Sequence, residues 1–249
     1  MDQKEKFYQN IGRPAYADGS IGIYDLKRRK QDVLWDEKWR KFLKYAKIFK
    51  YLPFVDFVFA AGSMALGNVR QDSDFDVLVG CRQNRLFTAR FFAVVVFGLL
   101  GIKRPKAVNE KREVKDKICL NHFVTPQSYR LSPPYDIYWN ELYENLVPIF
   151  GGRENIENFF SANDWLNPPR RYFDDIRLIN DDSRLKNIIE RLLAGRLGDL
   201  TERILKHFQI KRIACGLKKY PLGYKPRFKY ETGELEFHTD TSRIDSLLK

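Results

Sequence analysis

The chain has 249 residues, enough to bury a substantial core, and its net charge of +12 at neutral pH predicts a polyanionic partner, nucleic acid before a membrane. Its three cysteines lie far apart, so no disulfide framework or zinc-binding spacing is indicated and a reducing cytoplasm is the expected setting. The longest apolar run, residues 91–102, is shorter than the roughly twenty residues of a membrane-spanning helix, so we expect a buried helix and no membrane role.

The first part of the chain predicts an arm, a helix and a strand. Residues 1–34 lack clear periodicity and are assigned to an N-terminal arm. From Trp35 to Phe49, apolar residues recur at helical spacing with lysines and arginines on the remaining face, which predicts an amphipathic helix. The next segment, VDFVFAA at 55–61, is β-branched and aromatic and stops at Gly62. This pattern predicts a buried strand that ends in a tight turn.

A glycine-serine turn and a pair of aspartates follow this strand, in the sequence GSMALGNVRQDSDFDVLV. Gly62 and Ser63 form a small turn whose backbone N–H groups suit an anion. Ten residues later, Asp74 and Asp76 flank Phe75 at the start of a second apolar strand, and side chains two residues apart share one side of a strand. Two carboxylates opposite a phosphate-binding turn are suited to hold magnesium beside a phosphate chain.

These residues resemble the signature of the nucleotidyltransferase superfamily that includes DNA polymerase β, poly(A) polymerases, CCA-adding enzymes and aminoglycoside nucleotidyltransferases. The shared pattern is Gly-Ser or Gly-Gly, about ten residues, then acidic, apolar and acidic residues at a strand end. The SDFD form is similar to that of poly(A) polymerases, and the resemblance covers about residues 36–124. It implies that Gly62 lets the backbone approach a nucleoside triphosphate, that Ser63 binds a phosphate oxygen, and that Asp74 and Asp76 hold Mg²⁺.

Active members of this superfamily usually carry a third carboxylate on a neighbouring strand. The next strand is predicted at 117–125, where Asn121 stands at the third position. An amide can accept a hydrogen bond from a hydroxyl but cannot take its proton. Other sources of the base stay open: Glu113 and Asp116 just before the strand, if its register differs, and Glu141 and Glu144 on the following helix.

A second domain is predicted after the break LSPP at 131–134. Residues 35–130 then form the catalytic domain, and residues 131–249 a mainly helical C-terminal domain that ends in a β-hairpin around Thr232-Gly233. The fold class is therefore α/β (α+β), a nucleotidyltransferase fold with a mixed sheet and an appended helical domain. Two apolar stripes of that domain are expected to pack in its core: Leu185, Ile188, Ile189, Leu192 and Leu193, and then Leu200, Ile204, Leu205 and Phe208.

The segment 206–229 carries eight lysines and arginines and no acidic residue. Aromatic residues are interleaved with these cations, a mixture that suits a single-stranded backbone with stackable bases. The segment therefore predicts contact with RNA or another polyanion.

The sequence thus predicts a magnesium-dependent nucleotidyltransferase that moves a nucleoside monophosphate from a nucleoside triphosphate to a hydroxyl, preferably at an RNA 3′ end. One alternative is a small-molecule or protein nucleotidyltransferase of the aminoglycoside-modifying kind. A second alternative, kept open by Asn121, is a degenerate homologue that binds nucleic acid without turnover. The sequence does not determine the oligomeric state.

Overall fold

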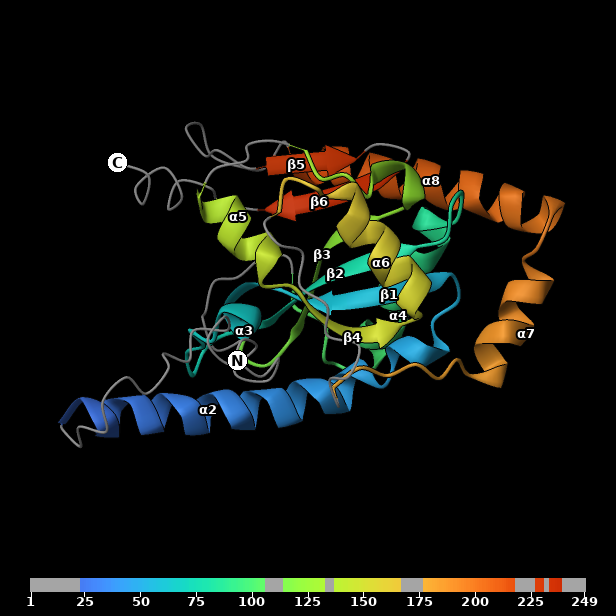
Figure 1. Ribbon diagram of the computed structural model, residues 1–249. Helices are drawn as coiled ribbons and strands as arrows, with labels where there is room; N and C mark the ends of the chain where they lie inside the picture. Colours follow the sequence, from blue (N-terminus) through green and yellow to red (C-terminus); the bar gives the residue numbers. More distant parts are fainter. Residues whose placement is uncertain are drawn as a thin grey trace.

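The computed structural model describes residues 23–105, 114–132, 137–166, 177–217, 227–230 and 233–238 (Figure 1). The described strands are β1 (Val55–Ala60), β2 (Phe75–Cys81), β3 (Ile118–Val124), β4 (Val147–Gly151), β5 (Arg227–Tyr230) and β6 (Glu234–His238). The described α-helices are α2 (Ile23–Ala46), α3 (Gly62–Leu66), α4 (Leu86–Leu99), α5 (Ile137–Glu144), α6 (Arg153–Ala162), α7 (Arg184–Leu192) and α8 (Arg196–Leu217). None of the described helices is long and apolar enough to span a membrane.

The six strands form one mixed sheet in the order β4-β1-β2-β3-β6-β5. β2 and β3 run parallel, whereas the other neighbouring pairs are antiparallel. The predicted mixed sheet and the predicted terminal hairpin, β5–β6, are both confirmed. β4, β5 and β6 come after residue 131 in the chain, yet they belong to the same sheet as β1, β2 and β3. Strands from both sides of the predicted domain boundary therefore share one sheet.

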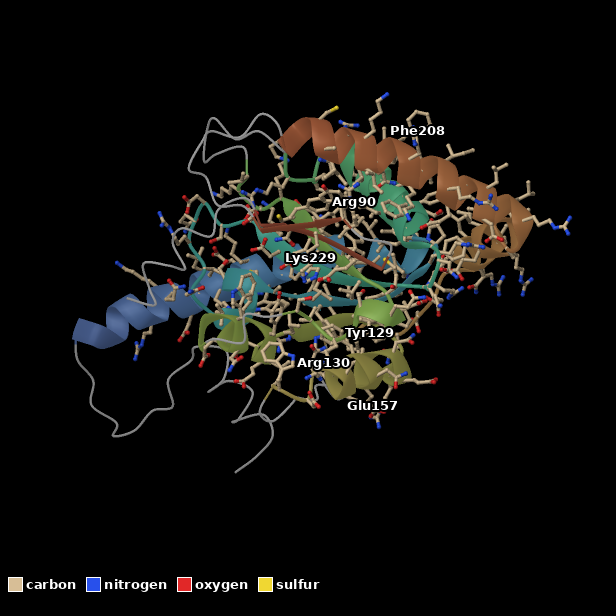
Figure 2. All side chains as sticks on the ribbon, turned by 90° about the horizontal axis from the view of Figure 1, so that it is seen from above. Arg90, Tyr129, Arg130, Glu157, Phe208 and Lys229 are labelled. Atoms are coloured by element: carbon tan, nitrogen blue, oxygen red, sulfur yellow. The ribbon has the colours of Figure 1, made fainter. Side chains whose placement is uncertain are left out.

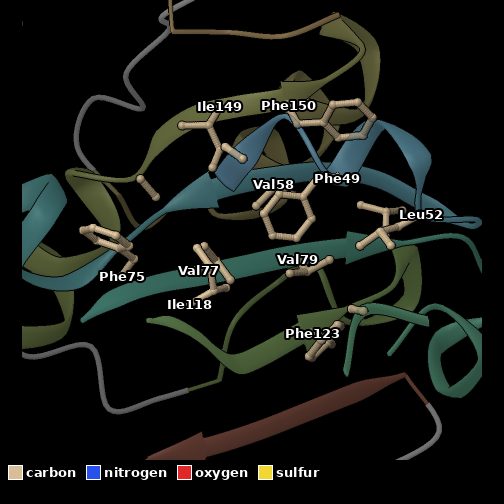
Figure 3. Packing of buried hydrophobic residues seen from close by; sticks show 14 of the residues in the cluster. Phe49, Leu52, Val58, Phe75, Val77, Val79, Ile118, Phe123, Ile149 and Phe150 are labelled. Carbon is tan, nitrogen blue, oxygen red and sulfur yellow. The ribbon is translucent and has the colours of Figure 1, made fainter. Parts of the chain in front are cut away.

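Helices cover both faces of the sheet, and each face has its own apolar cluster. On one face, β-branched and aromatic side chains of the central strands pack against α2, α4 and α8. Figure 3 shows part of this cluster, in which Val58, Val77 and Val79 from β1 and β2 pack with Phe49 and Leu52. The opposite face packs against α5 and α6 through a second cluster rich in aromatic residues. The side chains of β2 alternate between these clusters, and Asp76 lies in the series that faces α5 and α6.

One predicted boundary differs from the structure, and one strand was not predicted. The helix predicted from Trp35 begins at Ile23, so residues 23–34 extend α2 instead of belonging to the arm; residues 1–22 lie outside the described part. β4 was not predicted, although VPIFG at 147–151 has strand composition. Its Pro148 is tolerated because β4 lies at the edge of the sheet.

The apolar stripes predicted at α7 and α8 lie largely outside the core, so that prediction was wrong for most of their residues. Leu193 and Leu205 do pack against the first apolar cluster. Leu192 of α7 and Phe208 of α8 are 67% and 65% exposed, and Phe208 lies on the outer side of α8 (Figure 2). The packed side of α7 instead buries Lys186, whose Nζ donates to the Val55 carbonyl at 2.8 Å and to Asp182 at 2.7 Å. On α8, Glu202 accepts hydrogen bonds from the Phe87 and Thr88 amides at the start of α4. Polar contacts with specific partners therefore help to orient both helices, and on α8 they act together with the buried side chain of Ile213.

Candidate metal centre

The glycine-serine turn and the aspartate pair meet in space, as the motif predicts. β1 and β2 are antiparallel neighbours, and the Ala61 amide at the end of β1 donates to the Asp76 carbonyl at 3.0 Å. Gly62 then begins α3 with φ +60°, a left-handed conformation that glycine adopts without steric cost. A Cβ atom on Gly62 would lie 2.4 Å from Asp76 Oδ2. The turn is therefore packed directly against one of the two candidate metal ligands, with half-buried Ser63 next to it.

The register of β2 and β3 brings Asn121 to the aspartates. Asp76 pairs with Cys119, but Leu78 pairs with His122, so β3 carries one extra residue at this point. Such a bulge re-aims a side chain, and here Asn121 Nδ2 donates to Asp76 Oδ1 at 3.2 Å. Asn121 therefore stands beside the pair, at the position where the superfamily resemblance implies a third carboxylate.

Two further residues of the site were missed by sequence reasoning. Arg104 donates from Nη1 to Asp74 Oδ2 at 2.8 Å and lies 3.4 Å from Cys119 Sγ. Cys119 is buried, and its Sγ lies within 4.8 Å of one carboxylate oxygen of each of Asp74 and Asp76. The sequence did contain a signal for Cys119: it lies two residues before Asn121, so both side chains are expected on the same side of β3. No local signal marks Arg104, because a bridge between Lys103 and Ile118 brings it to the site.

The site combines closely spaced negative groups with partial burial. Burial and the charge of Asp74 raise the pKa of Asp76 to about 7, against the opposing influence of Arg104 and the Cys119 thiol. Burial lowers the pKa of Arg104, but Cys119 and Asp74 raise it by more, so the guanidinium stays charged. Burial, followed by the charges of Asp76 and Asp74, raises the pKa of the Cys119 thiol. These shifts mark a place where a divalent cation would relieve repulsion between the two carboxylates.

The alternative sources of a third carboxylate are placed elsewhere. Asp116 is held by Lys38 at 2.7 Å and by Lys41 at 2.6 Å, an ion-paired cluster at the packed side of α2. Glu141 and Glu144 lie on α5, and neither they nor Asp116 belong to a metal-ligating group among the described residues. Glu113 lies outside the described residues.

The basic segment is only partly described, and not all of its cations face solvent. Residues 218–226 lie outside the described part. Lys229 is held by Glu234 at 3.2 Å and by Glu236 at 3.5 Å, so its charge is neutralised within the hairpin. On α8, Arg203, Lys206 and Lys211 line an open pocket of about 480 Å³ together with His207 and Ile210. This pocket is one cationic surface among the described residues that a polyanion could contact.

No protein-family model, curated protein or solved structure matches the chain. What the structure itself defines is an α+β fold with a mixed six-stranded sheet and a cluster of two carboxylates and a thiol beside a glycine turn.

Proposed function

We propose that this protein is a nucleotidyltransferase with the fold of the polymerase β-like superfamily, which uses Mg²⁺ to move a nucleoside monophosphate from a nucleoside triphosphate to a hydroxyl. One observation carries the proposal. Gly62, the first residue of the predicted phosphate turn, lies so close to Asp76 that a single Cβ atom would collide with the carboxylate. This close approach supports one site built from both parts of the sequence signature, which ten residues separate.

The residues at this site fit a magnesium ion shared with a triphosphate. Mg²⁺ is usually bound by one or two carboxylates together with substrate phosphates and water, and Asp74 and Asp76 supply that carboxylate pair. When bound, the ion would neutralise the triphosphate and polarise the attacking hydroxyl. Gly62 leaves room for the triphosphate to approach the backbone, and Ser63 offers its amide and hydroxyl to a phosphate oxygen.

The reaction forms a bond between the acceptor oxygen and the α-phosphorus and breaks the bond from that phosphorus to the β-phosphate oxygen. Pyrophosphate leaves, and the acceptor proton passes to water. The amide of Asn121 orients Asp76 through its hydrogen bond but cannot take that proton. Catalysis in this protein would then depend mainly on positioning and charge neutralisation, as is general for phosphoryl transfer.

RNA is the preferred acceptor, because the chain carries a net charge of +12 and the pocket on α8 is lined by cations. A cationic small-molecule acceptor would instead need a local acidic patch, such as the exposed pair Asp181 and Asp182. One observation favours the second candidate function, a degenerate homologue that binds without turnover. Asn121 occupies the third position and places an amide beside Asp76.

A transfer assay tests these alternatives. The full chain would be incubated with each α-labelled nucleoside triphosphate, Mg²⁺ and total RNA, with Asp76→Asn as the matched inactive variant. We expect label to enter RNA in the wild type, with one pyrophosphate released per label, and to be absent with the variant. Label on protein or on small hydroxyl compounds alone would favour the first alternative. Binding of RNA and triphosphate without transfer would favour the degenerate homologue.

A further inference from the structure

We propose that Cys119 is a third metal ligand beside Asp74 and Asp76, so that the centre binds thiophilic divalent cations such as Zn²⁺ or Cd²⁺ more tightly than Mg²⁺, and that Arg104 competes with the ion for these ligands. The inference rests on the metal site of the proposed function and adds a ligand that the superfamily resemblance does not imply. It concerns which metal the site selects.

The backbone places the thiol at the aspartates. Cys119 is the register partner of Asp76 across the parallel β2–β3 pair, so the two side chains leave the sheet side by side. The Sγ atom and one oxygen from each aspartate lie within 4.8 Å of one another. Ligands about 2.0 and 2.3 Å from a tetrahedrally coordinated ion lie about 3.5 Å apart. Side-chain movements of up to about 1.3 Å therefore close the group around an ion.

A second observation shows that a cation is stabilised at this point. Arg104 Nη1 lies 2.8 Å from Asp74 Oδ2 and 3.4 Å from Cys119 Sγ, so one cationic nitrogen contacts two of the three proposed ligands. The Arg104 side chain is one third exposed and has solvent into which it can withdraw. A divalent ion on the same atoms would displace the guanidinium. Arg104 therefore lowers the affinity for any metal while it occupies Asp74.

The donor set determines the class of metal. Mg²⁺ prefers oxygen ligands, whereas thiolate together with carboxylate suits softer divalent ions. On binding, a metal–sulfur bond forms and the thiol proton passes to the buffer; no oxidation state changes. In the proposed transferase, Zn²⁺ would then compete with Mg²⁺ for the same ligands.

Titration with Cd²⁺ tests this inference without any assay of activity, because a cadmium–thiolate bond gives an ultraviolet charge-transfer absorption. All proteins would carry Cys215→Ser, since Cys215 is the exposed free thiol among the described residues, whereas Cys81 is buried. We expect one equivalent of Cd²⁺ to produce the absorption in this background, and Cys119→Ser to abolish it. Arg104→Gln should keep the absorption and bind Cd²⁺ about tenfold more tightly, because a charge-assisted contact to Asp74 is removed.

Two controls keep the outcomes distinct. Thermal unfolding would show that Cys119→Ser still folds, and Asp76→Asn would be titrated by calorimetry beside it. Heat of binding that needs Asp76, without a thiolate absorption, would overturn the role of Cys119 but leave the metal site of the proposed function intact. Absence of metal binding in every variant, including Arg104→Gln, would overturn both. An unchanged affinity of Arg104→Gln for Cd²⁺ would overturn the inference that Arg104 competes with the metal ion.

Discussion

Substitution of Gly62 by alanine should separate the conformational role of this glycine from its role at the site. Alanine at φ +60° costs about 1 kcal/mol in the left-handed region. Its Cβ would also meet Asp76 Oδ2 at 2.4 Å, where about 3.4 Å is an ordinary contact, so the carboxylate must retreat by about 1 Å. A displacement of that size at a reacting centre costs on the order of a hundredfold in rate. We therefore expect a modest loss of stability and a roughly hundredfold loss of transfer.

Gly195 provides a matched control for this experiment. Its φ is +68°, and an added Cβ would meet nothing within 4 Å. Gly195→Ala should therefore lower stability by a similar amount, about 2–4 °C in the unfolding midpoint, with transfer unchanged. Thermal unfolding, metal-dependent triphosphate binding and label transfer would be measured on both variants. Wild-type transfer in Gly62→Ala would refute the inference that the turn and Asp76 form one site.

Three further predictions concern the base, an ion-paired cluster and the acceptor. Asn121→Asp should preserve or raise transfer at neutral pH, because it restores a carboxylate beside Asp76; a loss of transfer with intact folding would contradict this placement. Although burial alone would raise it, hydrogen bonds from two lysines of α2 lower the pKa of Asp116, so its contribution to stability is present above about pH 4 and lost on further acidification. Asp116→Asn should lower the urea concentration at the unfolding midpoint at pH 7. Below about pH 4, this midpoint should fall less steeply in the variant than in the wild type, and identical dependence on pH in the two proteins would refute this. Changing Arg203 and Lys211 to serine should reduce the salt dependence of single-stranded RNA binding by about 0.7 in log–log slope per lost contact, whereas an unchanged slope would exclude α8 from the RNA surface.

The local architecture of the site could be predicted from the sequence because it depends on short-range patterns. The run 55–61 gave β1 to within one residue, and the positive φ of Gly62 agrees with the predicted turn. The strand predicted at 117–125 is β3. β-branched composition identifies both strands, and a glycine identifies the turn, without knowledge of their neighbours.

The rest depends on contacts between distant parts of the chain. Arg104 reaches Asp74 because its neighbour Lys103 forms a β-bridge with Ile118, the first residue of β3. The contact of Asn121 with Asp76 requires a bulge in β3, and no residue in this segment indicates a bulge from the sequence. On α7, helical periodicity identified an apolar stripe but not its direction, because the buried Lys186 is satisfied by Val55 and Asp182. An amphipathic pattern predicts that the apolar side of a helix faces the core. On α7, polar contacts with specific partners place a lysine on the packed side instead.

Magnesium-dependent binding of a triphosphate tests the central claim most directly, because it does not require knowledge of the acceptor. A non-hydrolysable nucleoside triphosphate would be titrated calorimetrically into the wild type and into Asp76→Asn, each with and without Mg²⁺. We predict that Mg²⁺ tightens binding to the wild type at least about tenfold and has no such effect on the variant, since Asp76 holds the shared ion. Equal affinity with and without Mg²⁺ in both proteins would contradict the assignment of this site as a nucleotidyltransferase centre.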